Sequence, residues 1–284
     1  MCIRDRPEII RTTSPGSPNT VASTKEILAD KIADCRAIGI RLLVIIENDE
    51  EPVREFVRSN FTDTEKTHDL LGYVILRVGA KNAKTVPARK ALFESMNWTV
   101  PEKGKILVVA IDGDGSEIDR TEVDTNSGSA TEVATTFVSK NIGPKKDALK
   151  KYNDALSEAK RTGKKVWIRL SQTRCAPCFH FSRWVEQNRS ELEQGFVFVK
   201  IDDLLDANAT EVIKKLLGDK HFGIPYCQIL DADGNLVIDS EGPLGNIGHP
   251  SSFEGINHLK KMLKSHRGFD EDQVDSLAQD VRNH

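Results

Sequence analysis

The sequence has no long hydrophobic run, no block of like charge and few cysteines. None of its apolar stretches reaches the roughly 18 residues that a membrane-spanning helix needs. Its 40 basic and 43 acidic residues leave a net charge of −3 without a strongly basic stretch, which argues against a nucleic-acid or anionic-membrane partner. Five cysteines in 284 residues are too few for a disulfide scaffold. The 38% of hydrophobic residues and the length are typical of a globular protein with two domains.

The first 23 residues are set apart from the rest. The opening MCIRDR is the translation of ATGTGTATAAGAGACAG, a transposon end used to build sequencing libraries, and the alternative is a genuine N-terminus of that composition. We expect an adapter-derived start with the original N-terminus missing, so Cys2 is left out of the functional cysteines and the lack of a signal peptide is uninformative. Residues 7–23, rich in proline, serine and threonine, are predicted to form a flexible linker.

From Thr24 onward, helical patterns and apolar strands follow an order that occurs twice. Three pairs of positions align the two copies: Pro52 with Pro177, Val100-Pro101 with Ile224-Pro225, and the hairpin-turn stretches DGDG at 112–115 and DADG at 231–234. The pattern predicts two copies of one α/β unit. We assign them to residues 24–143 and 144–267, followed by a C-terminal helical extension at 268–284.

The residues with the clearest chemistry are Cys175 and Cys178, at a strand-to-helix junction with a proline between them. A thiolate is the nucleophile in disulfide exchange, and the unpaired N–H groups and dipole of a helix N-terminus stabilise it. Cys175 stands at this end, next to Arg174, whereas Cys178 lies one turn into the helix. This arrangement suits Cys175 as the attacking thiol and Cys178 as the resolving thiol.

Two other interpretations of the cysteine pair stay open. The two residues can be structural thiols, or they can bind copper or zinc together with His180 or His221, since C-x-x-C is also half of a zinc site. No second C-x-x-C exists, so a metal site would be incomplete. The two other cysteines, at positions 35 and 227, lie in apolar patterns and are predicted to be core thiols.

Residues 145–266 resemble the thioredoxin superfamily, through the order βαβαββα, the C-x-P-C motif and the Ile224-Pro225 pair before the third strand. The resemblance implies an active-site disulfide between the two cysteines of the motif and a cis-proline at Pro225. A cis bond would lay a backbone edge against the cysteines, where an extended substrate peptide can pair. The aligned Pro101 is then expected to show the same kink.

Two positions depart from the family pattern. Arg174 stands where the family usually has a tryptophan, and Arg169 where an acidic residue is common. Both changes favour thiolates, and they weaken the case for general-base assistance. In the N-terminal copy, Glu50 and Val53 replace the cysteines. That copy is predicted to be either a module for substrate holding or dimerisation, or a degenerate repeat that stabilises or spaces the active one.

The sequence therefore predicts two tandem thioredoxin-like α/β folds of bacterial type. The predicted activity is thiol–disulfide exchange on protein substrates through Cys175 and Cys178, with Arg174, Ile224 and Pro225 in substrate binding. No cofactor is expected, and the partners are protein disulfides or dithiols and a redox partner protein, without nucleic acid or a membrane span. The alternative is a metal-binding or peptide-binding protein without redox turnover. Because exported members of this superfamily are common, we expect a location in the periplasm or cell envelope.

Overall fold

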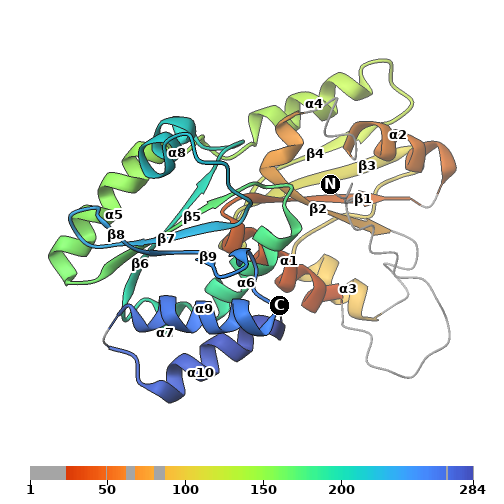
Figure 1. Ribbon diagram of the computed structural model, residues 1–284. Helices are drawn as coiled ribbons and strands as arrows, with labels where there is room; N and C mark the ends of the chain where they lie inside the picture. Colours follow the sequence, from red (N-terminus) through yellow and green to blue (C-terminus); the bar gives the residue numbers. More distant parts are fainter. Residues whose placement is uncertain (1–23, 49, 62–67, 80–86, 267, 284) are drawn as a thin grey trace. The chain divides into compact units, whose positions relative to one another are not determined.

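A computed structural model describes residues 24–48, 50–61, 68–79, 87–266 and 268–283. The predicted adapter-derived start and linker lie outside the described residues. The chain divides into two compact units, Met1–Gly143 and Pro144–His284. Each unit contains one four-stranded mixed sheet with helices packed on both faces (Figure 1).

The N-terminal unit is built around the buried strand β1. Its elements are α1 (Thr24–Ile38), β1 (Arg41–Glu47), α2 (Glu51–Phe61), the 3-10 helix η1 (His68–Gly72), β2 (Tyr73–Gly79), α3 (Pro87–Ser95), β3 (Lys105–Ile111), β4 (Glu117–Asp124) and α4 (Ala130–Lys140). The strand order is β2-β1-β3-β4, and only the β1–β2 pair is parallel. Helices α1 and α3 cover one face and α2 and α4 the other, so β1 is an almost continuous apolar run.

The C-terminal unit repeats this topology. Its elements are α5 (Ala148–Thr162), β5 (Lys165–Ser171), α6 (Ala176–Gln187), α7 (Arg189–Leu192), β6 (Phe196–Asp202), α8 (Ala209–Leu217), β7 (Tyr226–Leu230), β8 (Leu236–Asp239), β9 (Glu241–Gly242), β10 (Gly245–Asn246), α9 (Phe253–Lys264), α10 (Glu271–Asp280) and the 3-10 helix η2 (Val281–Asn283). The strand order is β6-β5-β7-β8, and again only the pair of first strands, β5 and β6, is parallel. The two sheets therefore share strand order and strand direction.

The predicted hairpin turns join the last two strands of each sheet. In the first, Asp112 and Ser116 close the turn by a backbone hydrogen bond, and in the second Asp231 and Asn235 do the same. Gly115 and Gly234 have φ values of 91° and 88°, a region that favours glycine. The aspartates of both DxDG stretches therefore serve the turns, as predicted.

The helical layers of the C-terminal unit place one buried tryptophan at the centre of the core. Helices α5 and α8 cover one face of the sheet, while α6, α9 and α10 cover the other. Trp167 on β5 is fully buried and packs against Phe181 and Trp184 of α6. Since β5 ends where α6 approaches, this packing fixes the helix that carries the cysteine pair.

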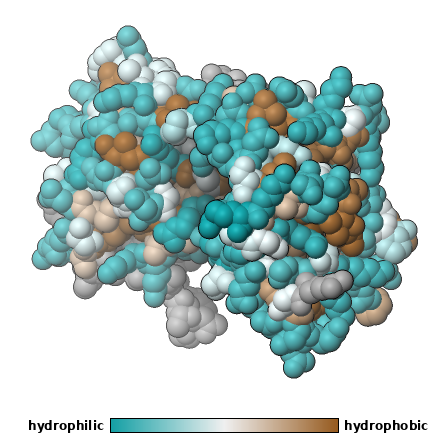
Figure 2. Space-filling model, turned by 90° about the vertical axis from the view of Figure 1, so that its left-hand side faces the viewer, coloured by the Kyte–Doolittle hydropathy of each residue, from teal (hydrophilic) through white to brown (hydrophobic). Residues whose placement is uncertain are grey.

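The C-terminal helix α10 belongs to the same core. Asp270 and Gln273 form a capping box at its start, which satisfies backbone N–H groups that the first turn leaves unpaired. Val274, Leu277 and Ala278 are buried against α6 and α9. None of the helices within the described residues is long and apolar enough to cross a membrane. On the face drawn in Figure 2, hydrophobic spots are separated by hydrophilic residues.

Candidate active site

The cysteine pair lies at the junction between β5 and α6. Cys175 and Cys178 form a disulfide, with their Cα atoms 5.1 Å apart, inside the range that a disulfide bridges. Cys175 is half-buried, whereas Cys178 is only 1% exposed. The two sulfurs therefore differ in access, because a substrate thiol reaches the first more readily than the second.

Cys175 is also the N-cap residue of α6. Its Sγ accepts a hydrogen bond from the backbone N–H of Cys178 at 3.2 Å, in a position where serine, threonine or aspartate usually cap. Pro177 fits the first turn, which needs no N–H from that residue. In the reduced state, the same N–H and the helix dipole are placed to stabilise a thiolate at Cys175.

The loop that precedes β7, residues 223–225, lies against the disulfide. We call it the Pro225 loop. The Ile224 carbonyl oxygen is 3.8 Å from Cys175 Sγ, and the Ile224–Pro225 peptide bond is cis. Ile224 is half-buried and Gly223 is exposed, so part of this loop is accessible from solvent next to the sulfur. An extended peptide can pair with such an edge.

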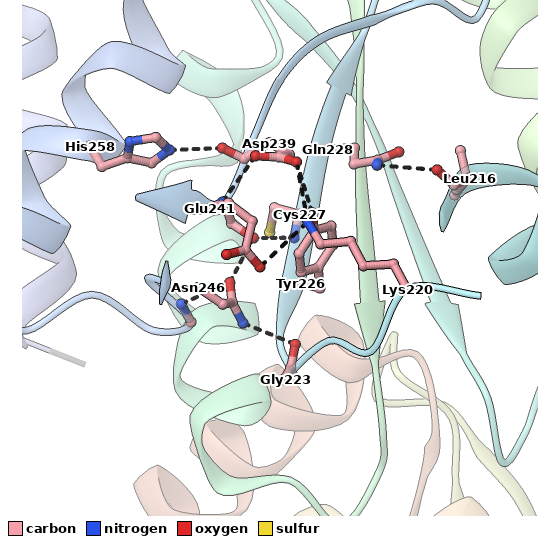
Figure 3. Close-up of polar contacts among 12 residues, drawn as sticks. Leu216, Lys220, Gly223, Tyr226, Cys227, Gln228, Asp239, Glu241, Asn246 and His258 are labelled. Atoms are coloured by element: carbon pink, nitrogen blue, oxygen red, sulfur yellow. Dashed lines mark hydrogen bonds and ion pairs between the residues drawn. The ribbon is translucent and has the colours of Figure 1, made fainter. Parts of the chain in front are cut away.

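One side chain that sequence reasoning missed holds this loop. Asn246, on β10, donates hydrogen bonds from Nδ2 to the carbonyl oxygen of Gly223 (Figure 3) and to that of Pro225. Asn246 follows Pro225 by 21 positions, in the stretch EGPLGN, which carries only turn signals. Because its partners are backbone carbonyls, no pattern of side chains in the sequence marks the contact.

Buried charges lie on the sheet next to α6. Arg169 on β5 and Lys200 on β6 are paired neighbours, and burial lowers the pKa of Arg169 to about 10 and that of Lys200 to about 8. Lys200 Nζ lies 3.2 Å from Asp202, a buried carboxylate. The guanidinium of Arg169 lies 5.5 Å from the ring centre of Phe181, one turn after Cys178 on α6. A cation therefore occupies the position where an acid is common in the family.

Residues 147–232, which include the cysteine pair and the Pro225 loop, match a protein-family model described as thioredoxin-like. The C-terminal unit carries a thioredoxin-like domain. Together with the strand order, this confirms the predicted resemblance and the fold class of two mixed α/β sheets flanked by helices. The Cys175–Cys178 disulfide lies within the segment that matches this family model. A search of curated proteins finds no significant match.

Several solved structures are similar to the chain. A disulphide isomerase from Xylella fastidiosa Temecula1 is 22% identical over 47% of this chain and 90% of that chain, with a TM-score of 0.31. The first two thioredoxin domains of Eps1p from Naumovozyma dairenensis are 14% identical over 79% and 92% of the two chains, with a TM-score of 0.27. The same two domains of Saccharomyces cerevisiae Eps1p are 10% identical over 85% of this chain and 95% of that chain, with a TM-score of 0.28.

The remaining described cysteines lie in the cores. Cys227, in the thioredoxin-like domain, and Cys35, in the N-terminal unit, are buried and not disulfide-bonded, as predicted for core thiols. Burial raises the pKa of Cys227 to about 11 and that of Cys35 to about 12, since a thiolate is poorly solvated there. Both are therefore poor nucleophiles at neutral pH. Cys2 lies outside the described residues.

The histidines of the metal-binding alternative are both at the surface. His180 and His221 are exposed. In the part of the chain that the structure describes, no group of three or more His, Cys, Asp or Glu side chains is placed to hold a metal ion. The alternative therefore lacks a complete set of protein ligands among these residues.

The corresponding junction of the N-terminal unit has no thiol. Val53 is 1% exposed and belongs to the core, and Glu50 is half-buried. The prediction of the same kink at Pro101 is wrong, because the bond before Pro225 is the only cis peptide bond within the described residues. Three residues separate Pro101 from β3, whereas none separates Pro225 from β7. The longer connection is held differently, by Asn48 Nδ2, which donates to the carbonyl oxygens of Pro101 and Glu102.

Proposed function

We propose that this protein is a thiol–disulfide oxidoreductase that acts on protein substrates through Cys175 and Cys178. The observation that carries the proposal is the asymmetric disulfide at the N-terminus of α6, with a half-buried first sulfur and a buried second one. Cys175 is the sulfur that forms bonds with substrates. Cys178 closes the disulfide from inside the helix.

The exchange proceeds in two balanced steps. When the protein oxidises a substrate dithiol, one substrate thiolate attacks Cys175 Sγ, a mixed disulfide forms, and Cys178 leaves as a thiolate that takes up a proton. The second substrate thiolate then attacks the substrate sulfur, which releases Cys175 as a thiolate. Two electrons pass from the substrate to the cysteine pair, and a protein disulfide as redox partner removes them. Reduction of a substrate disulfide is the same sequence in reverse, with a protein dithiol as the electron source.

The neighbours of Cys175 bind the substrate in this proposal. Arg174 is exposed and adjacent, so it can attract carboxylates of the substrate and favour the thiolate. The backbone of Ile224 pairs with an extended peptide, and Pro225, which has no N–H, ends the segment that can pair in this way. Because Glu50 and Val53 replace the thiols, the N-terminal unit takes no part in exchange and serves to stabilise or space the thioredoxin-like domain.

A differential alkylation experiment tests the proposal. After mild oxidation, mass spectrometry should find the Cys175–Cys178 bridge, and dithiothreitol should open it. In the reduced, folded protein, Cys175 should react at least about tenfold faster than Cys35 or Cys227, because burial raises the pKa of both core thiols. The oxidised protein should then form disulfides in a dithiol peptide, or the reduced one should cleave a disulfide peptide. Zinc or copper bound to the reduced protein, without exchange in either direction, would favour the metal-binding alternative.

Replacing Arg174 with tryptophan, the residue usual in the family, is expected to raise the pKa of Cys175. The guanidinium charge favours the thiolate, and the effect should be modest because solvent and salt screen an exposed charge. The measurement is the alkylation rate of Cys175 as a function of pH, whose midpoint should move upward, and less so at high salt. Arg161→Trp, at an exposed position on α5, is the matched control and should leave the midpoint in place.

A further inference from the structure

The side chain of Asn246 holds the Pro225 loop from outside the four-stranded sheet. Asn246 Nδ2 donates to the carbonyl oxygens of Gly223 at 2.9 Å and of Pro225 at 3.0 Å. These two carbonyls flank Ile224, whose own carbonyl oxygen lies 3.8 Å from Cys175 Sγ. In Figure 3 the amide of Asn246 points toward Gly223. The two bonds therefore hold the backbone on both sides of the carbonyl group that lies near the reactive sulfur.

The amide of Asn246 is itself held in one orientation. Its Oδ1 lies 2.7 Å from the hydroxyl of Ser240, which is almost fully buried, and 3.3 Å from the backbone N–H of Gly248. The same hydroxyl accepts a hydrogen bond from the backbone N–H of Cys227 at 2.9 Å. Since this leaves the hydroxyl proton for Asn246, Oδ1 is the acceptor and Nδ2 must face the loop. The network thus ties the loop to the central strand β7.

We infer that Asn246 is a positioning residue that holds the Pro225 loop ready to pair with a substrate peptide beside Cys175. The inference rests on the proposed exchange function and adds a residue to it. The short hairpin β9–β10, inserted between β8 and α9, carries Asn246 to this place. A loop whose carbonyls are already fixed loses less conformational freedom when a peptide binds, so binding is tighter.

The experiment compares Asn246→Asp with the unchanged protein. The aspartate keeps an oxygen for Ser240 but has no N–H to donate, and its charge repels the two carbonyl oxygens. Exchange with a disulfide-bonded peptide should slow by about tenfold or more, mainly through a higher KM, because the loop no longer presents a fixed edge. Reaction of the Cys175–Cys178 disulfide with dithiothreitol, which needs no peptide pairing, should stay within about twofold. Hydrogen exchange of the segment 221–227 should become faster.

Two further variants serve as checks. Asn235→Asp removes a side-chain hydrogen bond in the turn at the far end of β7 and should change none of these quantities. Ser240→Ala removes the hydroxyl that orients the Asn246 amide. It should raise the KM for the peptide and speed hydrogen exchange at 221–227, both by less than Asn246→Asp does. This variant tests the inference if Asn246→Asp fails to fold.

The outcomes separate the two ideas. If the Asn246→Asp variant lost reactivity equally toward the peptide and toward dithiothreitol, Asn246 would have only a general structural role. If hydrogen exchange of residues 221–227 did not change, Asn246 would not hold the Pro225 loop. If the unchanged protein exchanges with no peptide, the proposed function fails, and the positioning role fails with it. If the unchanged protein exchanges normally and Asn246→Asp keeps its KM, only the positioning role is wrong.

Discussion

Replacing Cys178 with serine is expected to trap substrate proteins as mixed disulfides on Cys175. In the reduced variant, Cys175 keeps its place at the N-terminus of α6 and still attacks a substrate disulfide. The mixed disulfide then persists, because the thiol that would resolve it from one turn further into the helix is gone. Turnover should fall to the uncatalysed rate. Non-reducing electrophoresis, with mass spectrometry of the linked peptides, should show adducts at Cys175 that dithiothreitol releases.

Replacing Cys175 with serine should abolish both turnover and trapping. Cys178 is 1% exposed and cannot take over the attack on a protein substrate. Cys227→Ser is the matched control, since Cys227 is a buried thiol of the same domain that is not disulfide-bonded. Apart from any loss of stability, it should keep turnover when made alone, and it should keep trapping when combined with Cys178→Ser. Adducts that form through Cys178 would reverse the assigned roles. No adducts with any disulfide substrate would favour a binding protein without redox turnover.

The sheets could be predicted because their central strands leave a direct trace in the sequence. β1 (RLLVIIE) and β5 (KVWIRLS) are buried on both faces, and most of their buried positions are apolar, with Glu47, Arg169 and Ser171 as the polar exceptions. The cysteine junction was equally visible, since a strand followed by a proline-containing helical turn fixes where both thiols lie. These features depend on the local sequence, so they can be predicted without knowledge of tertiary contacts.

The loops beside the sulfur could be predicted only in part. The repeat aligned Pro101 with Pro225, but the three residues between Pro101 and β3 let Asn48 hold that connection in another conformation. Asn246 was missed because it contacts carbonyl groups that every residue possesses. Arg169 was recognised as a departure from the family, while its burial against Phe181 depends on how α6 packs on the sheet. Contacts that depend on packing between distant segments leave little trace in one sequence.

Truncating Trp184 is expected to cause a large loss of stability in the thioredoxin-like domain. Its side chain is fully buried on α6, between Trp167 of the sheet and the C-terminal helix α10. Its Nε1 donates a hydrogen bond to the carbonyl oxygen of Leu277 at 3.1 Å. Trp184→Ala should lower the free energy of unfolding by about 3–5 kcal/mol, because it removes a large apolar surface and leaves a cavity. Chemical denaturation followed by circular dichroism measures this change.

Two further variants separate the lost hydrogen bond from the lost packing and provide a control at an exposed position. Trp184→Phe fills much of the volume but leaves the Leu277 carbonyl without its donor, so it should cost about 1–3 kcal/mol. Leu236→Ala, at a position 54% exposed on β8, should change the free energy of unfolding by less than about 0.5 kcal/mol. A loss below about 1 kcal/mol for Trp184→Ala would mean that α10 does not pack on α6 in solution, since a buried tryptophan in a closed core cannot be removed at so small a cost. The helix that carries both cysteines would then lack its support from the C-terminal segment.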